Sequence, residues 1–480
     1  MRVLLDGRTL TIPSLVTAAS GTIDVDVDPG ALDLVESRHA DLRAALERGA
    51  VYGANTGVGA NRHERTDDGE GHGLRLLRSH CAGVGPEEDD VTARAAMTVR
   101  LNQILAGGSG VSRRVAEALA TAVREGAVPT LHPWGAIGTA DLSALAELGL
   151  TLAGERPWRT GRGPVTTIDV TDALPMISSS ALTVATAALA VAEAESQLRA
   201  SIVVAALSFL ALRGNPEAYA QVVHLARPHP YQAALAGALR RLVDGSVPAA
   251  RIQDPFGLRV LPQVTAPARH AARLLADVVT AELNAAVENP LVTVDGVRHH
   301  GQFHTAALAS ALDAVRGAFL PVLSLSASRL GLLMRPEMTG LRAFLASGPP
   351  GSSGLMVTEY VVQDLLAEMR TDVQPTAAGT LTISLGLEEH ASFATQGARS
   401  LRSMTRLAPM LLAAELVAAV RALRMAPDRL VEGAARNAFE TAAKALEADM
   451  ADRPLDVDLT RAAEVLPALA DHIADWATRA

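Results

Sequence analysis

The chain has 480 residues, more than one compact hydrophobic core usually holds. Its formal net charge of −9, without long basic runs, argues against a nucleic-acid partner. Hydrophobic residues make up 49% of the sequence but only 14 residues are aromatic. Because Ala and Leu are the strongest apolar helix formers and dominate here, we expect a mainly α-helical protein.

Several function classes are disfavoured by single residue types. The sequence holds 42 Arg but one Lys, Lys444, which lies in a C-terminal helical pattern without a Gly-rich loop. A pyridoxal-phosphate Schiff base or a P-loop needs a lysine, so neither is expected. Cys81 is the lone cysteine, which rules out an internal disulfide and fits a reducing cytosol. The N-terminus lacks a signal-peptide pattern, and the longest apolar run, residues 202–212, is too short to span a membrane. A cytoplasmic protein is expected.

The first part of the chain reads as a small domain, residues 1–165. Residues 3–5, Val-Leu-Leu, and 10–12, Leu-Thr-Ile, flank a turn at Asp6-Gly7, which predicts a strand pair followed by a helix. Residues 60–73 are polar and Gly-rich, so they predict an exposed connector or a mobile lid.

The remainder predicts a helical body. Residues 178–212 are apolar nearly all round, which predicts a buried central helix. Further long helical patterns cover 266–288, 306–334, 354–370 and 384–424. We therefore expect a long central helical bundle at 166–425, and polar-faced C-terminal helices at 426–480.

A series of motifs resembles one known family in order along nearly the whole chain. They are VYGANTGVG at 51–59, LLRSHCAGVGP at 76–86, ARPHPYQ at 226–232, QDPFGLRVLPQ at 253–263, GQFH at 301–304 and LEEHASF at 387–393. These are similar to motifs of the histidine and aromatic amino-acid ammonia-lyases and aminomutases. The resemblance implies an ammonia-lyase-like fold and a homotetramer whose active sites draw on three subunits.

The segment at 128–145, VPTLHPWGAIGTADLSAL, resembles the family segment in which Ala-Ser-Gly cyclises to methylidene-imidazolone, an electrophilic prosthetic group. At 135–142 the flanking glycines and Asp-Leu match, but only Thr139 and Ala140 lie between them. Ala140 lacks the β-hydroxyl that dehydration requires. Shifting the frame to Gly138-Thr139-Ala140 supplies a hydroxyl but misplaces both glycines. The sequence therefore predicts that the group does not form, and no other cofactor is expected.

The resemblance assigns roles to three residues that have plainer alternatives. Tyr52 corresponds to the base at the β-carbon, although a Tyr before a Gly turn is otherwise a packing residue. His80 corresponds to a substrate-pocket histidine, or is a half-buried histidine bonded to backbone. Arg259 corresponds to the arginine that binds the substrate carboxylate through both guanidinium arms, a geometry that Lys does not reproduce. Most other arginines are expected on the surface.

Further pocket positions fall on Gln253, Phe303 and Glu388. Glu388 is the second candidate catalytic residue, with a charge cluster on a helix surface as the alternative. Two positions depart from the family pattern: Phe256 stands where the family has Tyr, and Ser178 stands where it has the Asn that holds the prosthetic group. We expect both to line the substrate site.

Metal signals are weak. Three histidines lie close together at 299, 300 and 304, but the chain has no HExxH motif and no cysteine pair. We expect a structural or coincidental cluster and no metal site.

The expected function depends on the electrophile. Without it, general acid–base catalysis contributes about 10²–10⁴-fold, too little for deamination of a plain amino acid. The sequence therefore favours a lyase-fold enzyme that lacks the group and acts on an activated, carboxylate-bearing small molecule in specialised biosynthesis, by elimination, conjugate addition, isomerisation or cyclisation. One alternative is a catalytically silent homologue that binds a ligand or partner subunit. Another is an ordinary histidine or aromatic amino-acid ammonia-lyase.

Overall fold

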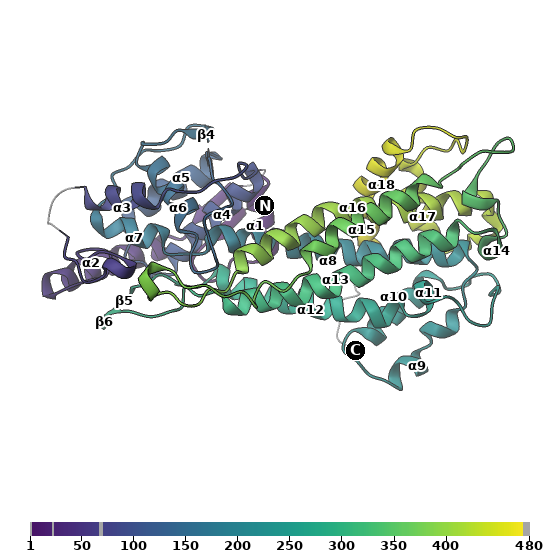
Figure 1. Cartoon of the computed structure of the whole chain (residues 1–480), viewed down its shortest axis with the longest axis horizontal. Coiled ribbons are helices and arrows are strands. Elements are labelled where there is room, and N and C mark those ends of the chain that lie inside the picture. The colour runs from purple at the N-terminus through teal and green to yellow at the C-terminus, as the bar shows by residue number, and fades with distance from the viewer. Residues whose placement is uncertain (1, 22–23, 67–70, 474–480) are drawn as a thin grey trace. The chain divides into compact units, whose positions relative to one another are not determined.

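The computed structural model describes residues 2–21, 24–66 and 71–473 and is mainly helical (Figure 1). The chain forms two compact units, each assembled from three separate segments. Unit 1 consists of Met1–Ala192, Leu275–Asp313 and Pro375–Arg399. Unit 2 consists of Glu193–Leu274, Ala314–Gln374 and Ser400–Ala480.

Short and medium helices build most of unit 1. They are α1 Ile12–Ala19, α2 Pro29–Arg48, α3 His72–His80, α4 Asp90–Leu105, α5 Arg113–Glu125, α6 Leu142–Leu152 and α7 Val170–Ile177. Two antiparallel strand pairs accompany them, β3 Val128–Pro129 with β4 Trp158–Thr160, and β5 Leu291–Thr293 with β6 Gly296–Arg298. Helix α3 packs against both α6 and α7.

The predicted strand pair at the N-terminus is wrong in its second strand. Strand β1, Arg2–Leu5, pairs in parallel with β2, Asp24–Val27, and residues 10–12 form no strand. The Thr11 side chain instead accepts a hydrogen bond from the Ser14 amide and caps α1, with Pro13 in the first turn. An N-cap Thr followed by Pro is a helix-start signal, and it outweighs the short apolar pattern.

Unit 2 contains a second set of helices. Its shorter helices are α9 Gln221–Leu225, α10 Gln232–Leu242, α11 Phe256–Arg259, α14 Pro336–Thr339, α15 Val357–Asp372, α17 Ala434–Ala445 and α18 Asp456–Ala470. Four long helices contribute residues to both units: α8 Ala181–Ala211, α12 Leu261–Leu283, α13 Ala306–Leu333 and α16 Ala394–Met425.

Helix α8 confirms the predicted buried central helix. Its region and α13 are the two helical stretches, among the described residues, that are long and apolar enough to cross a membrane. The apolar window that includes α8 is wholly buried inside the protein, and that of α13 is half buried. Since the side chains of α8 are covered by protein, its composition is that of a core helix.

The predicted helix at 384–424 begins later than expected. Helix α16 starts at Ala394, and the preceding residues contain only a short 3₁₀ turn, Ser384–Gly386. Ser384 and Leu385 have positive φ angles of 53° and 54°, which α-helix excludes. The loop replaces the first turns of the expected helix and carries Glu388.

The polar segment predicted as a connector or lid, residues 60–73, is described only in part. A 3₁₀ turn covers Gly59–Asn61 and α3 already begins at His72. Residues 67–70 lie outside the described residues. The boundaries drawn from the sequence at 165 and 425 stay predictions.

Candidate functional site

Tyr52 lies in a turn after α2 and is half-buried. Its hydroxyl oxygen accepts a hydrogen bond from the Gly59 amide at 2.7 Å. Burial raises the pKa of Tyr52, the Gly59 amide opposes this by stabilising the phenolate, and the negative charge of Glu388 raises the pKa further. Tyr52 is therefore a neutral phenol near pH 7, already hydrogen-bonded at the atom that would carry the negative charge.

A contact between two loops of unit 1 brings Glu388 close to the turn that contains Tyr52. The Ser384 hydroxyl accepts a hydrogen bond from the Ala60 amide at 3.1 Å. A Cβ on Gly59, which has φ of 56°, would meet Ser384 Oγ at 2.8 Å and Glu388 Oε1 at 3.8 Å. The glycine thus allows the two loops to approach closely, and it places the Glu388 carboxylate beside the turn that bonds Tyr52.

The Gly138 turn is held by residues from distant parts of the sequence. The Gly138 carbonyl accepts hydrogen bonds from Thr305 Oγ1 at 2.8 Å and from Ser392 Oγ at 2.9 Å. A Cβ on Gly138 would lie 2.0 Å from Ser392 Oγ, so only glycine fits there. Ala140 follows with a strained φ of 96°.

Asp141 holds the same turn through hydrogen bonds with Thr183 and Ser179. Its carboxylate accepts hydrogen bonds from the Thr183 amide at 2.8 Å and the Thr183 hydroxyl at 2.7 Å, while its own amide donates to the Ser179 carbonyl at 2.7 Å. Burial raises the pKa of Asp141 to about 6, although the bonds from Thr183 act in the opposite direction. Asp141 is thus engaged in fixing the backbone of the turn.

In the matching frame, this turn carries Thr139 and Ala140, followed by Asp141, where the family has Ala-Ser-Gly. Ala140 occupies the middle position, is buried and has no hydroxyl to eliminate. The next residue is Asp141, whose amide is already bonded to Ser179. Thr139, half-buried, carries the one hydroxyl between Gly138 and Asp141.

Three other residues assigned from the sequence also lie in unit 1. His80 ends α3, and its Nδ1 lies 2.8 Å from the Leu76 carbonyl. Because a carbonyl only accepts, Nδ1 carries the proton and Nε2 of the neutral ring is an acceptor. Ser178 is buried after α7 and accepts a hydrogen bond from the Asn289 amide at 3.1 Å. Phe303 lies half-buried in the turn before α13.

The remaining assigned residues form a separate cluster in unit 2. Arg259 ends α11 and donates through Nη1 to Gln253 Oε1 at 3.0 Å. Its guanidinium carbon lies 4.8 Å from the centre of the Phe256 ring, and Nε is buried without a hydrogen-bond partner among the described residues. Phe256 itself is 63% exposed. A guanidinium held by one amide and one ring keeps donors available for an anion.

The site residues expected from the sequence do not include the residues that hold these loops together. Hydroxyl groups hold the Tyr52 and Gly138 turns, and they belong to Ser384, Ser392, Thr305 and Thr183. Serine and threonine are common residue types, so their presence alone does not indicate this role. Two of them lie in or beside recognised motifs, Ser392 in LEEHASF and Thr305 directly after GQFH. That position was the available signal, but the partner of each hydroxyl is defined only by the fold.

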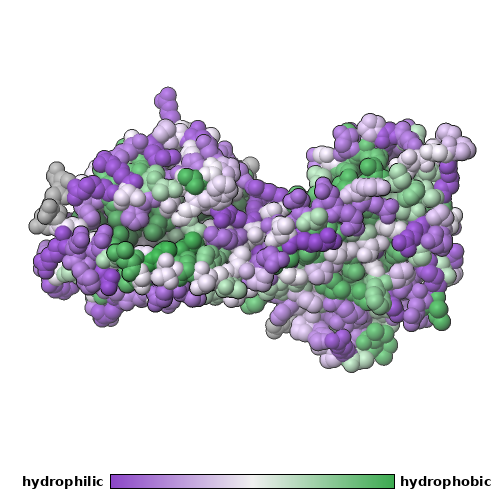
Figure 2. All heavy atoms as spheres, viewed as in Figure 1, coloured by the Kyte–Doolittle hydropathy of each residue, from purple (hydrophilic) through white to green (hydrophobic). Residues whose placement is uncertain are grey.

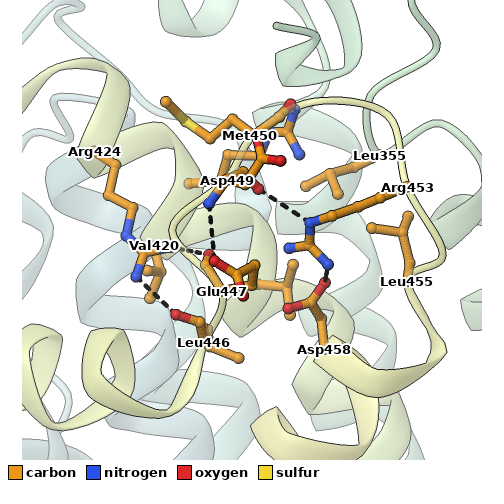
Figure 3. Close-up of a pocket in the computed structure, with 12 residues that line it drawn as sticks. Leu355, Val420, Arg424, Leu446, Glu447, Asp449, Met450, Arg453, Leu455 and Asp458 are labelled. Carbon is orange, nitrogen blue, oxygen red and sulfur yellow. Dashed lines mark hydrogen bonds and ion pairs between the residues drawn. The ribbon is translucent and has the colours of Figure 1, made fainter.

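A small cavity near the C-terminus of unit 2 is structural (Figure 3). Its volume of about 20 Å³ holds roughly one water molecule. Arg453 forms an ion pair with the buried Asp458, and Arg424 donates to the Leu446 carbonyl at 3.0 Å, as the dashed lines in Figure 3 show. The cavity is too small for a substrate, and these contacts fix the segment between α17 and α18.

Metal coordination finds no support among the described residues, which include no group of three or more His, Cys, Asp or Glu side chains able to hold an ion. The cluster near 299–304 contributes a histidine pair instead: His304 Nε2 lies 2.9 Å from His390 Nδ1. Burial lowers the pKa of His304, and the neighbouring His390 lowers it further.

Comparison with known proteins agrees with the motifs. The family model described as aromatic amino acid lyase matches residues 10–445. The histidine ammonia-lyase of Geobacillus kaustophilus is 31% identical over 446 residues, covering 88% of each protein. That of Sorangium cellulosum is 31% identical over 499 residues, covering 96% of this chain and 97% of that protein. The crystal structure of histidine ammonia-lyase from Trypanosoma cruzi matches with a TM-score of 0.91 at 25% identity, covering 100% of this chain and 96% of that chain.

These findings support the expected fold and family and correct the expected function. The mainly helical, ammonia-lyase fold is confirmed. The interpretation as an enzyme lacking the prosthetic group, acting on an activated molecule in specialised biosynthesis, is wrong: relatives named histidine ammonia-lyase match nearly the whole chain, and they favour that activity. It gave a change in one tripeptide more weight than similarity along the entire chain. The chain belongs to the aromatic amino acid lyase family.

Proposed function

We propose that this chain is an ammonia-lyase that eliminates ammonia from L-histidine or a closely similar α-amino acid. The observation that carries the proposal is the match to histidine ammonia-lyases at 28–31% identity over 88–97% of the chain. Tyr52, Gly59 and Glu388 lie close together in unit 1, which supports the proposal. Elimination requires a base for the β-proton, and the Gly59 amide and the Glu388 carboxylate both influence the pKa of the Tyr52 hydroxyl.

Tyr52 removes the β-proton in this proposal. A neutral phenol is a poor base, so the hydroxyl must ionise first. The Gly59 amide donates directly to the phenol oxygen and stabilises the phenolate, whereas the Glu388 carboxylate opposes ionisation. A cationic substrate group placed near Glu388 would neutralise that carboxylate and lower the pKa of Tyr52. Binding of a protonated amino group or imidazole would therefore activate the base.

Arg259 binds the substrate carboxylate. Its contact with Gln253 occupies Nη1 and its stacking on Phe256 fixes the guanidinium plane, so the remaining N–H groups present a planar pair of donors. His80 donates from Nδ1 to the Leu76 carbonyl, which leaves Nε2 as the ring nitrogen that faces a substrate imidazole in this proposal.

A homotetramer in the cytoplasm remains part of the proposal. Tyr52 and Arg259 belong to different compact units, and the family resemblance implies a pocket assembled from several subunits. Helix α9 exposes Val222, Val223 and Leu225, of which Val222 is 73% exposed. Figure 2 shows this hydrophobic group at the lower right, over α9. An apolar patch of this kind is typical of surfaces that contact another protein.

The test is ammonia release by the purified protein from L-histidine, L-phenylalanine and L-tyrosine, each followed together with the absorbance of the conjugated acrylate product. We expect product from L-histidine, with Tyr52→Phe as the inactive control. Release from L-phenylalanine or L-tyrosine but not L-histidine would overturn the substrate assignment, and release from none of the three would overturn the proposed activity.

A further inference from the structure

Unit 2 contains a cavity that the proposed reaction does not use. Its volume is about 420 Å³, within the range of roughly 300–1,000 Å³ that small-molecule sites occupy. One wall is the loop from α9 to the start of α10, and the other is a single face of α12, where the lining residues follow a spacing of three and four. The lining residues are Arg227, His229, Pro230, Gln232, Gln263, Ala266, Pro267 and His270.

The cavity is lined by one arginine and two histidines, all of which can donate hydrogen bonds. Arg227 and His229 come from the loop, and His270 comes from α12. No acidic side chain lines the cavity in the part of the chain that the structure describes. A guanidinium is always protonated and both imidazoles offer N–H donors, so the cavity favours an anionic group.

One polar wall residue is held in a fixed orientation. His224 Nε2 donates to the Ala218 carbonyl at 3.0 Å, which leaves Nδ1 as the acceptor. Gln232 Nε2 donates to that Nδ1 at 3.1 Å, and Gln232 is only 5% exposed. Burial lowers the pKa of His224, in agreement with a neutral ring. The Gln232 amide is therefore oriented by this network, and its oxygen remains as an acceptor.

Gln263 supplies a second acceptor on the opposite wall. Its Oε1 is buried and has no hydrogen-bond partner among the described residues. A buried amide oxygen without a donor is uncommon in folded proteins and costs free energy. A ligand that carries an N–H or O–H group would satisfy it.

The loop that forms the first wall is held in place. Tyr231 has a positive φ of 64°, is buried, and packs its ring 5.9 Å from that of His270. The Arg269 guanidinium lies 5.4 Å from the centre of the same ring. Such a strained conformation persists only where the surrounding packing fixes it, so the cavity is preformed.

We propose that this cavity is a second binding site, distinct from the Arg259 cluster, for a small carboxylate that also carries an N–H or O–H donor. The carboxylate binds Arg227, His229 and His270, and the donor binds the amide oxygens of Gln263 and Gln232. This site does not depend on the proposed deamination, because none of its lining residues takes part in it.

Isothermal titration calorimetry with imidazole-4-acetate as the probe tests the proposal on the full-length protein. Arg227→Gln should weaken binding at this site about tenfold to a hundredfold, the effect of losing a hydrogen bond to a charged group. Arg241→Gln, which removes an exposed arginine of α10 that does not line the cavity, is the matched control and should bind as the wild type does. Arg259→Lys should also keep this site. Equal binding by Arg227→Gln and wild type would overturn the proposal.

Two further binding measurements identify the chemical class of the ligand. Gln263→Leu should weaken imidazole-4-acetate but leave acetate, which brings no N–H group, unchanged. Inorganic phosphate that binds more tightly than imidazole-4-acetate, and loses that binding in Arg227→Gln, would overturn the carboxylate assignment. Ammonia release from L-histidine by Arg227→Gln should match the wild type, so failure of this site and failure of the proposed activity give separate results.

Discussion

At the scale of single residues, the pKa of Tyr52 reflects opposing influences. Burial and the Glu388 carboxylate raise it, and the Gly59 amide lowers it. A tyrosine in this balance responds strongly to any change in nearby charge, because one unit charge at short range is worth more where water is partly excluded. Chemistry at this position is therefore controlled by its neighbours.

Replacing Tyr52 with Phe removes one hydroxyl and the acceptor of the Gly59 hydrogen bond. We expect kcat for L-histidine to fall by about 10²–10⁴-fold, the usual contribution of a general base, with little change in thermal midpoint. Tyr360→Phe, at a residue that is 70% exposed, is the control and should keep full activity. Wild-type turnover by Tyr52→Phe would show that another group removes the proton.

Glu388→Gln tests the electrostatic coupling. Since the carboxylate raises the pKa of Tyr52, its removal lowers that pKa and the basic form appears at lower pH. The alkaline rise of kcat/KM, which follows ionisation of the base, should therefore shift toward lower pH. A profile extended to alkaline pH, in which the rise of kcat/KM lies at the same pH in Glu388→Gln and in the wild type, would contradict the coupling.

Arg259→Lys keeps a positive charge but loses the planar pair of donors. The contacts with Gln253 and Phe256 position a guanidinium, and an ammonium cannot reproduce them. Substrate binding should weaken by roughly 1.5–3 kcal/mol, appearing mainly in KM. An unchanged KM would place the carboxylate elsewhere.

At the scale of elements, a buried ion pair joins three long helices within unit 2. Arg329 on α13 binds Glu415 on α16 through Nε at 2.6 Å and Nη2 at 2.9 Å. Ser208 on α8 and Ser326 on α13 donate to the same carboxylate at 2.7 and 2.5 Å. Both charged side chains are 0% exposed. Because each partner is fully desolvated, the pair tolerates loss of one member poorly.

Glu415→Gln leaves Arg329 buried without its counter-charge. We expect a loss of about 3–5 kcal/mol in unfolding free energy, measured by denaturant titration followed by circular dichroism. The double variant Arg329→Met with Glu415→Leu removes both charges and should recover much of this loss. Glu432→Gln, at the 86% exposed end of an ion pair with Arg436, should change stability by less than about 1 kcal/mol. Equal effects of Glu415→Gln and Glu432→Gln would refute the argument.

At the scale of the whole molecule, the assigned residues divide between the two compact units. Tyr52, His80, Ser178, Phe303 and Glu388 belong to unit 1, and Gln253, Phe256 and Arg259 belong to unit 2. In the proposed pocket, which is built from residues of several subunits, activity depends on assembly of the subunits as well as on folding of each chain.

Light scattering at micromolar concentration should therefore give a mass four times that of the 49.9 kDa chain. Dilution that produces smaller species should reduce the specific activity in parallel. Substituting Val222 and Leu225 of α9 with Asp tests whether this exposed patch contributes to assembly. A fully active monomer would refute the composite pocket.

Hydrophobic pattern and motif order, by themselves, determined the mainly helical fold, the buried helix near 181–211 and the family, because core burial and chain-long similarity are both properties of many residues at once. The prediction from sequence was wrong at residues 10–12, where Thr11 caps a helix and no strand forms. It was also wrong at 384–393, where positive φ angles exclude the expected helix. The contacts of Glu388 with the Tyr52 turn, and of Ser392 and Thr305 with Gly138, join positions far apart in the chain. Only the tertiary structure decided these, because a hydroxyl or carboxylate gains a role from the partner that folding brings to it, and no local pattern records that partner.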